Sequence, residues 1–133
     1  MIVSVAPDVL AALPRLAAAA APREACGLLV GRAGAGGVAV TGLAPSRNLA
    51  AAEDTFEIDT ALQLALQRRL RGTAEAVVGV WHSHLAGAPT PSPRDAEGAW
   101  ETGLAWLITA GEETTAWRAL GDGAGFAPAE LAR

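Results

Sequence analysis

The stretch VVGVWHSHLAGAPTPSPRD, residues 77–95, carries the strongest structural signal in the sequence. Its β-branched start predicts a strand over Val77–Trp81, and the proline-rich residues 85–91 predict a loop. Ser92 followed by Pro93 predicts the start of a helix, because serine is favoured at the N-cap and proline at the first helical position. The segment therefore predicts a strand, a loop and a helix in this order.

The only two histidines of the chain lie at the end of this predicted strand. His82 and His84 are two residues apart, so a strand places both imidazoles on one face and Trp81 and Ser83 on the other. Two imidazoles on one face can share a metal ion. A pair of ordinary surface or core histidines is the alternative interpretation of this spacing alone.

Asp95 lies early in the predicted helix and can supply a third, carboxylate ligand. Two histidines and one carboxylate leave a fourth tetrahedral position for water, as catalytic zinc sites do. Asp95 also fits a structural role, because acidic residues stabilise the first turn of a helix. Ser92 fits the N-cap of the same helix, and its hydroxyl would still project into the mouth of the site.

Glu24 directly precedes a second apolar segment, which predicts a buried strand over residues 25–31. A carboxylate at a strand edge beside a metal-bound water can take the proton of that water and pass it to a leaving amine. The alternative is a surface glutamate at a strand entrance. Cys26 lies two residues further on, and we interpret it as a small buried residue.

Together these residues resemble the signature of the JAMM (MPN-plus, Mov34/JAB) zinc metalloproteases in their short, stand-alone prokaryotic form. His82 and His84, seven further residues, Ser92, two residues and Asp95 have the spacing of the JAMM motif. The stretch EACGLLVG, residues 24–31, resembles the glutamate-bearing strand of that family. The resemblance extends over nearly the whole chain.

The resemblance implies a role for each of these residues. His82, His84 and Asp95 would bind one Zn²⁺ together with a water, Glu24 would activate that water, and Ser92 would stabilise the oxyanion. Similar proteins hydrolyse the peptide or isopeptide bond after the C-terminal Gly-Gly of ubiquitin-like proteins. For the short prokaryotic form, the implied partner is a ubiquitin-fold sulfur carrier.

The expected fold is α/β, more closely α+β with cytidine-deaminase-like layering, in one domain that spans residues 1–133. A mixed central β-sheet would be flanked by two or three helices, with the zinc site at a strand end and a helix N-terminus. Asp8 is expected to cap the first helix, and either Asp59 or Thr60 the second. We expect strands over residues 2–6, 26–31, 38–43, 55–58, 77–81, 104–109 and 114–120, and a tail from residue 126.

Two features differ from the family or stay open. Leu85 stands where many relatives have proline, which affects the conformation of the loop more than the ligands. Trp100 and Trp106 fit either the core or a peptide groove. The alternatives to a peptidase are a non-catalytic binding module of the same fold and a DNA-repair-associated or phage-tail relative.

Composition excludes several other classes of protein. The net charge is −4 and all ten basic residues are arginines without a marked cluster, which argues against nucleic-acid binding. No apolar run approaches the roughly 18 to 20 residues of a membrane helix. The single cysteine fits a reducing compartment, so we expect a cytoplasmic protein. Exposed edge strands would allow a homodimer.

Overall fold

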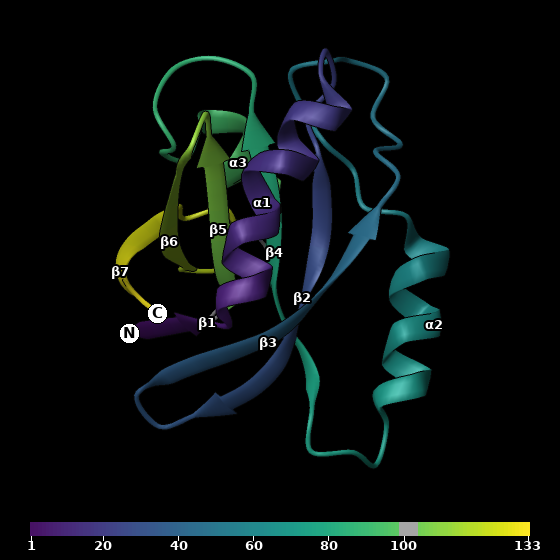
Figure 1. The fold of residues 1–133 in the computed structure, drawn as a ribbon, viewed down its shortest axis with the longest axis vertical. Helices are drawn as coiled ribbons and strands as arrows, with labels where there is room; N and C mark the ends of the chain where they lie inside the picture. The colour runs from purple at the N-terminus through teal and green to yellow at the C-terminus, as the bar shows by residue number, and fades with distance from the viewer. Residues whose placement is uncertain (99–103) are drawn as a thin grey trace.

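A mixed β-sheet with three helices makes up the fold of residues 1–98 and 104–133, which are those that the computed structural model describes (Figure 1). The helices and strands follow in the order β1 (Ile2–Val5), α1 (Pro7–Ala20), β2 (Cys26–Gly34), β3 (Gly37–Ser46), α2 (Thr60–Leu70), β4 (Ala76–His84), α3 (Pro93–Gly98), β5 (Ala105–Ala110), β6 (Glu113–Ala119) and β7 (Phe126–Ala132).

The strands are arranged in the order β1-β3-β2-β4-β5-β6-β7, and the sheet closes into a barrel because β1 pairs with both β3 and β7. The pairs β1–β3, β1–β7 and β4–β5 are parallel, and the others are antiparallel. The expected mixed sheet is therefore confirmed. Parallel pairing of β4 with β5 requires a crossover connection, and this crossover contains the loop and helix that carry Asp95.

Helix α1 packs across one face of the sheet (Figure 1). Val9 and Leu13 are buried at a spacing of four, as an amphipathic helix requires. The expected cap at Asp8 is wrong: the helix begins at Pro7, its N-cap is Ala6, and no side chain caps it. Pro7 at the first position starts the helix in place of a side-chain cap, since its φ is already helical, and Asp8 lies within the first turn.

The two faces of the sheet support two apolar clusters. Alternate residues of β5 show the division, because Leu107 packs with α1 in the larger cluster whereas Trp106 belongs to a smaller cluster. Val80, Phe56 and Phe126 contribute to the smaller cluster. The predicted metal ligands of β4 lie on this second face, away from α1.

Two secondary-structure predictions are wrong. Residues 55–58 form no strand but only an isolated bridge between Ile58 and Asn48, because Thr55 and Glu57 bond instead to the Asn48 side chain. The expected tail is β7, which pairs with β6 and β1. Among the described residues, no helix has the length and apolar character needed to cross a membrane.

Candidate metal centre

Strand β4 ends at the candidate site. His82 is fully buried and His84 is half-buried, and their Nε2 atoms lie 3.2 Å apart. Trp81, directly before His82, points to the opposite face, where its Nε1–H donates to Thr109 Oγ1 over 2.9 Å. The alternation predicted from the sequence is therefore confirmed, and it brings both imidazoles to one point.

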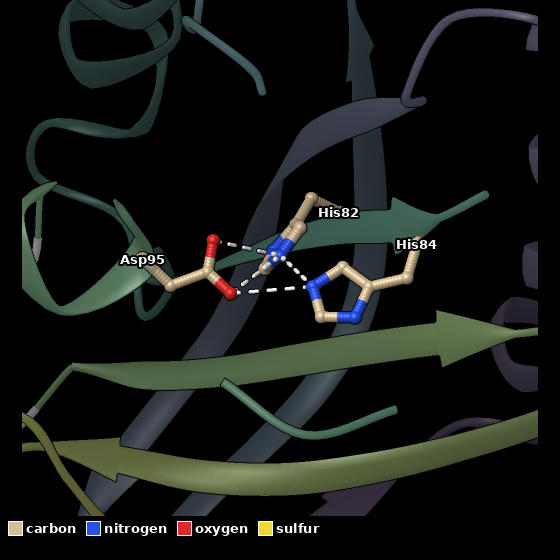
Figure 2. A group of neighbouring side chains, drawn as sticks. All are labelled: His82, His84 and Asp95. Carbon is tan, nitrogen blue, oxygen red and sulfur yellow. Dashed lines mark hydrogen bonds and ion pairs between the residues drawn. The ribbon is translucent and has the colours of Figure 1, made fainter. Parts of the chain in front are cut away.

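Asp95 completes a triangle of possible ligand atoms (Figure 2). Its carboxylate oxygen Oδ2 lies 3.2 Å from Nε2 of His82 and 3.2 Å from Nε2 of His84. A tetrahedral zinc ion with bonds of about 2.0–2.2 Å separates its ligands by about 3.3 Å. The three side chains therefore fit a single ion of this size without rearrangement.

The two imidazoles are held in place by different contacts. Nδ1 of His84 lies 3.0 Å from the carbonyl oxygen of Ala88, so this nitrogen carries the proton and Nε2 keeps its lone pair for a metal. The ring of His82 is stacked on Phe56 and contacts the edge of Trp106. Nδ1 of His82 is buried without a hydrogen-bond partner among the described residues.

The start of α3 orients the carboxylate. The backbone N–H of Ser92 donates to Oδ2 of Asp95 over 2.8 Å, and the backbone N–H of Asp95 donates to Oγ of Ser92 over 3.1 Å. This reciprocal pair is a capping box. Because Oγ of Ser92 acts as the acceptor in it, the hydroxyl proton remains free to be donated elsewhere.

The three ligand side chains influence one another's pKa values. Burial opposes ionisation of Asp95, but hydrogen bonds from His82 and His84 outweigh it and hold the pKa of Asp95 below its usual range. Burial lowers the pKa of His82, whereas the hydrogen bond to Asp95 raises the pKa of His84. An ionised carboxylate beside a neutral buried imidazole is the donor set that a divalent cation requires.

Glu24 lies next to His84 through the register of β2 and β4. Cys26 pairs with His82 in that register. One residue further, the backbone N–H of Ala25 donates to Oγ of Ser83 over 2.8 Å, and the N–H of Ser83 donates to the Ala25 carbonyl. Continued by one residue, this register would set Glu24 opposite His84 on the same face, and the electrostatic interaction of Glu24 with His84 and Asp95 agrees with that position.

The Glu24 carboxyl group is 7% exposed. Burial raises its pKa to about 7, while His84 opposes this shift and Asp95 adds to it. A carboxyl group with a pKa near neutrality can both accept and release a proton. By contrast, burial raises the pKa of the Cys26 thiol to about 11, which leaves it an unreactive core residue as expected.

Three residues of the site's surroundings were not predicted as functional. Ser83 holds β2 against β4, Phe56 covers His82, and Asn48 connects the loop before α2 to Glu24. The role of Ser83 could have been predicted from its place between the two histidines. Alternation along the strand directs its side chain to the opposite face, away from the candidate metal site, where it can bond to the neighbouring strand. Phe56 and the loop of Asn48 belong to the resemblance to the family, but no periodicity predicts their contacts, because these depend on how the loop folds.

The open questions about individual residues are partly answered. Trp106 is buried on β5, where it contacts His82 and Phe126, so it belongs to the core. It also borders a groove beside Asp95. Trp100 lies outside the described residues. Leu85 is 43% exposed and contributes no ligand.

Comparison with protein families identifies the family of this chain. The family of prokaryotic homologs of the JAB domain matches residues 6–120. The chain belongs to this family. This is the family that the motif resembled. Among the described residues of this JAB domain, His82, His84 and Asp95 form a cluster that could bind a metal.

Solved structures share the fold of this JAB domain. The solution structure of DSY2949 from Desulfitobacterium hafniense has a TM-score of 0.84 at 27% identity, covering 97% of this chain and 90% of that one. A Salinibacter ruber protein gives 0.74 at 28% identity, covering 98% and 90%. AF2198, a JAB1/MPN domain protein from Archaeoglobus fulgidus, gives 0.61 at 16% identity over both full chains, which shows the fold alone.

A curated protein is also similar in sequence. Desampylase from Haloferax volcanii is 33% identical over 88 residues, which are 65% of this chain and 62% of desampylase. The match therefore spans less than two thirds of desampylase. It establishes a distant homologue of this JAB domain.

Proposed function

We propose that this JAB domain is a zinc-dependent metallopeptidase. One observation carries the proposal: three potential ligand atoms from His82, His84 and Asp95 lie 3.2 Å apart, and the buried Glu24 is close enough for its charge to interact with those of His84 and Asp95. This arrangement provides a cation site and a proton acceptor together, and metal-assisted hydrolysis of a peptide bond uses both.

The residues divide the reaction between them. Zinc bound to this triad would act as a Lewis acid toward the scissile carbonyl. Glu24 takes a proton from the attacking water and delivers it to the leaving amine, a task suited to a pKa near 7. Ser92 donates its free hydroxyl proton to the oxygen that becomes negative in the tetrahedral intermediate.

We propose the bond after a C-terminal Gly-Gly of a ubiquitin-like protein as the substrate, with a ubiquitin-fold sulfur carrier as the preferred partner. The similarity to desampylase supports a protein substrate of this kind. A groove of about 240 Å³ also runs beside Asp95, between residues 55–58 and Trp106. A groove of this size suits an extended tail whose last residues have no side chains.

The proposal includes the setting of the reaction. Cys26 is buried and unpaired, which supports a cytoplasmic location. A net charge of −4 supports a protein substrate and not a nucleic acid. The proposed catalytic domain covers residues 1–133.

The test is cleavage of a ubiquitin-fold protein whose Gly-Gly terminus is extended by a short peptide, followed by mass spectrometry. Zinc-loaded wild type should cut after the second glycine. Zinc-loaded Glu24→Gln should lose on the order of 100-fold or more in kcat, the usual contribution of a general base. Glu112→Gln is the matched control, because Glu112 is an exposed carboxylate in the β5–β6 turn. Equal rates for wild type and Glu24→Gln would refute the role of Glu24, and zinc-loaded protein that cleaves nothing would favour a binding module.

A further inference from the structure

Asn48 uses the full hydrogen-bonding capacity of its side chain. Nδ2 donates to the carbonyl oxygen of Glu24 over 3.0 Å and to that of Thr55 over 2.9 Å. Oδ1 accepts from the backbone N–H of Ala50 over 2.9 Å and from that of Glu57 over 3.0 Å. An amide side chain offers two donor hydrogens and one oxygen that accepts twice, so no capacity is left over.

These four bonds connect two parts of the site that are distant in sequence. One part is the backbone of Glu24, 24 residues before Asn48. The other part is the loop of residues 49–58. A second contact follows the same path, because the N–H of Glu24 donates to the carbonyl of Glu53 over 3.3 Å. Arg23 adds hydrogen bonds to the carbonyls of Asn48 and Ala50.

The loop in turn reaches the metal centre at two points. Phe56 stacks on His82 with ring centroids 4.5 Å apart. Oδ1 of Asp54 lies 3.6 Å from Nη1 of Arg94, the residue before Asp95. The backbone of Glu24 and the cover over His82 therefore depend on the same asparagine, although Asn48 itself touches none of the three ligand side chains.

We propose that Asn48 is a positioning residue that sets the place of Glu24 relative to the metal centre. It acts on the backbone from which the Glu24 side chain extends and does not contact the reacting atoms. The inference rests on the proposed function for its catalytic readout. Displacement of a catalytic group by about 1 Å can cost on the order of 100-fold in rate. Loss of the partly buried hydrogen bond from Asn48 to the Glu24 carbonyl is therefore expected to lower kcat measurably.

Two substitutions distinguish the donor group, Nδ2, from the acceptor group, Oδ1, of the Asn48 side chain. Asn48→Ala removes all four hydrogen bonds. Asn48→Asp keeps both acceptor bonds to Ala50 and Glu57, which preserves the loop, but it loses both donor bonds, including the one to Glu24. Thr73→Ala is the matched control, because the Thr73 hydroxyl also bonds to backbone groups but lies at the end of α2.

The measurements are kcat, KM, zinc affinity and amide hydrogen exchange of each variant. We expect Asn48→Ala and Asn48→Asp to lose about tenfold to 100-fold in kcat. KM and zinc affinity of Asn48→Asp should stay within about threefold, since substrate groove and ligands are unchanged. Thr73→Ala should lose stability alone. If both Asn48 variants are destabilised but retain the wild-type kcat, Asn48 is merely structural and the proposal is wrong.

Amide exchange separates this result from failure of the proposed function. Even if the wild-type protein cleaves no substrate, amide exchange still shows whether Asn48 holds the backbone at Glu24 in place. The Glu24 amide donates to the Glu53 carbonyl in the same loop. In Asn48→Asp this bond should open more often, because Asn48 no longer holds the Glu24 carbonyl, so the Glu24 amide should exchange faster. The Ala50 and Glu57 amides should keep their protection, because they donate to the oxygen that Asp retains. Unchanged protection of the Glu24 amide in both variants would overturn the positioning role independently of any activity.

Discussion

Phe56 lies flat against the imidazole of His82, with ring planes inclined by 18° and centroids 4.5 Å apart. His82 has no partner for Nδ1 among the described residues. This stacking, together with the contact to Trp106, therefore restrains the ring plane of a buried candidate ligand. Removing a group that orients a metal ligand typically weakens metal binding by about tenfold to 100-fold.

Phe56→Ala should accordingly lower both stability and zinc affinity. We expect about 2 kcal/mol less unfolding free energy from lost aromatic packing and at least about tenfold weaker zinc binding. Phe126→Ala is the control, because Phe126 contacts Trp106 at 4.9 Å but is not stacked on His82. Chemical denaturation and competitive zinc titration measure the two effects. Equal zinc affinities in the two variants would contradict the role of Phe56.

Ser92 is expected to serve both the helix and the reaction. Ser92→Ala should cost about 1 kcal/mol of stability through loss of the N-cap and on the order of 100-fold in kcat through loss of the hydroxyl donor. Ser92→Gly should cost only a few tenths of a kcal/mol with the same loss of kcat. If kcat instead followed stability across the two variants, Ser92 would be only a cap.

Gly79 determines how closely β4 approaches β5. A Cβ atom at this position would lie 2.1 Å from the carbonyl oxygen of Ala105. Gly79→Ala should therefore separate the pair that sets His82 opposite Ile108, at a cost of about 3 kcal/mol or more. Gly36→Ala is the control, because a Cβ there meets nothing within 4 Å. Urea unfolding that gave equal midpoints for both variants would contradict this account of the strand pair.

Glu24 should make the metal-free protein less stable as the pH rises. Its pKa is about 7 when folded, raised from 4.5 chiefly by burial, so the folded state holds the proton more tightly. Unfolding free energy is therefore lost between about pH 4.5 and 7, by no more than about 3 kcal/mol. Glu24→Gln should match wild type near pH 4 and be more stable at pH 8. Denaturation in chelator that showed the same difference at both pH values would contradict the raised pKa.

Local patterns predicted the local geometry of the candidate ligands. Alternation along β4 was sufficient to place His82 and His84 together, and the cap signature at Ser92 was sufficient to start α3 at Pro93, with Asp95 in its first turn. The position of Glu24 beside His84 required the register of β2 against β4, which is a long-range property. No periodicity indicates the contacts of the loop that carries Phe56.

The missed strand has a local cause. Strand β7 contains Pro128 and three small or charged residues, Ala127, Ala129 and Glu130, between Phe126 and Ala132, so it lacks the β-branched alternation that marks a strand. Its pairing with β1 closes the sheet. Strand β1 has the β-branched residues that β7 lacks, so its pairing with β7, and not the sequence of β7 itself, makes this segment a strand.

Metal content tests the central claim most directly. Elemental analysis of wild type and His84→Ala, both purified without chelator, compares three protein ligands with two. We predict about one zinc per chain in wild type and little in the variant, since two ligands bind zinc weakly. No metal in wild type, and none after reconstitution with zinc, would contradict the account and leave a JAB domain that binds partners without catalysis.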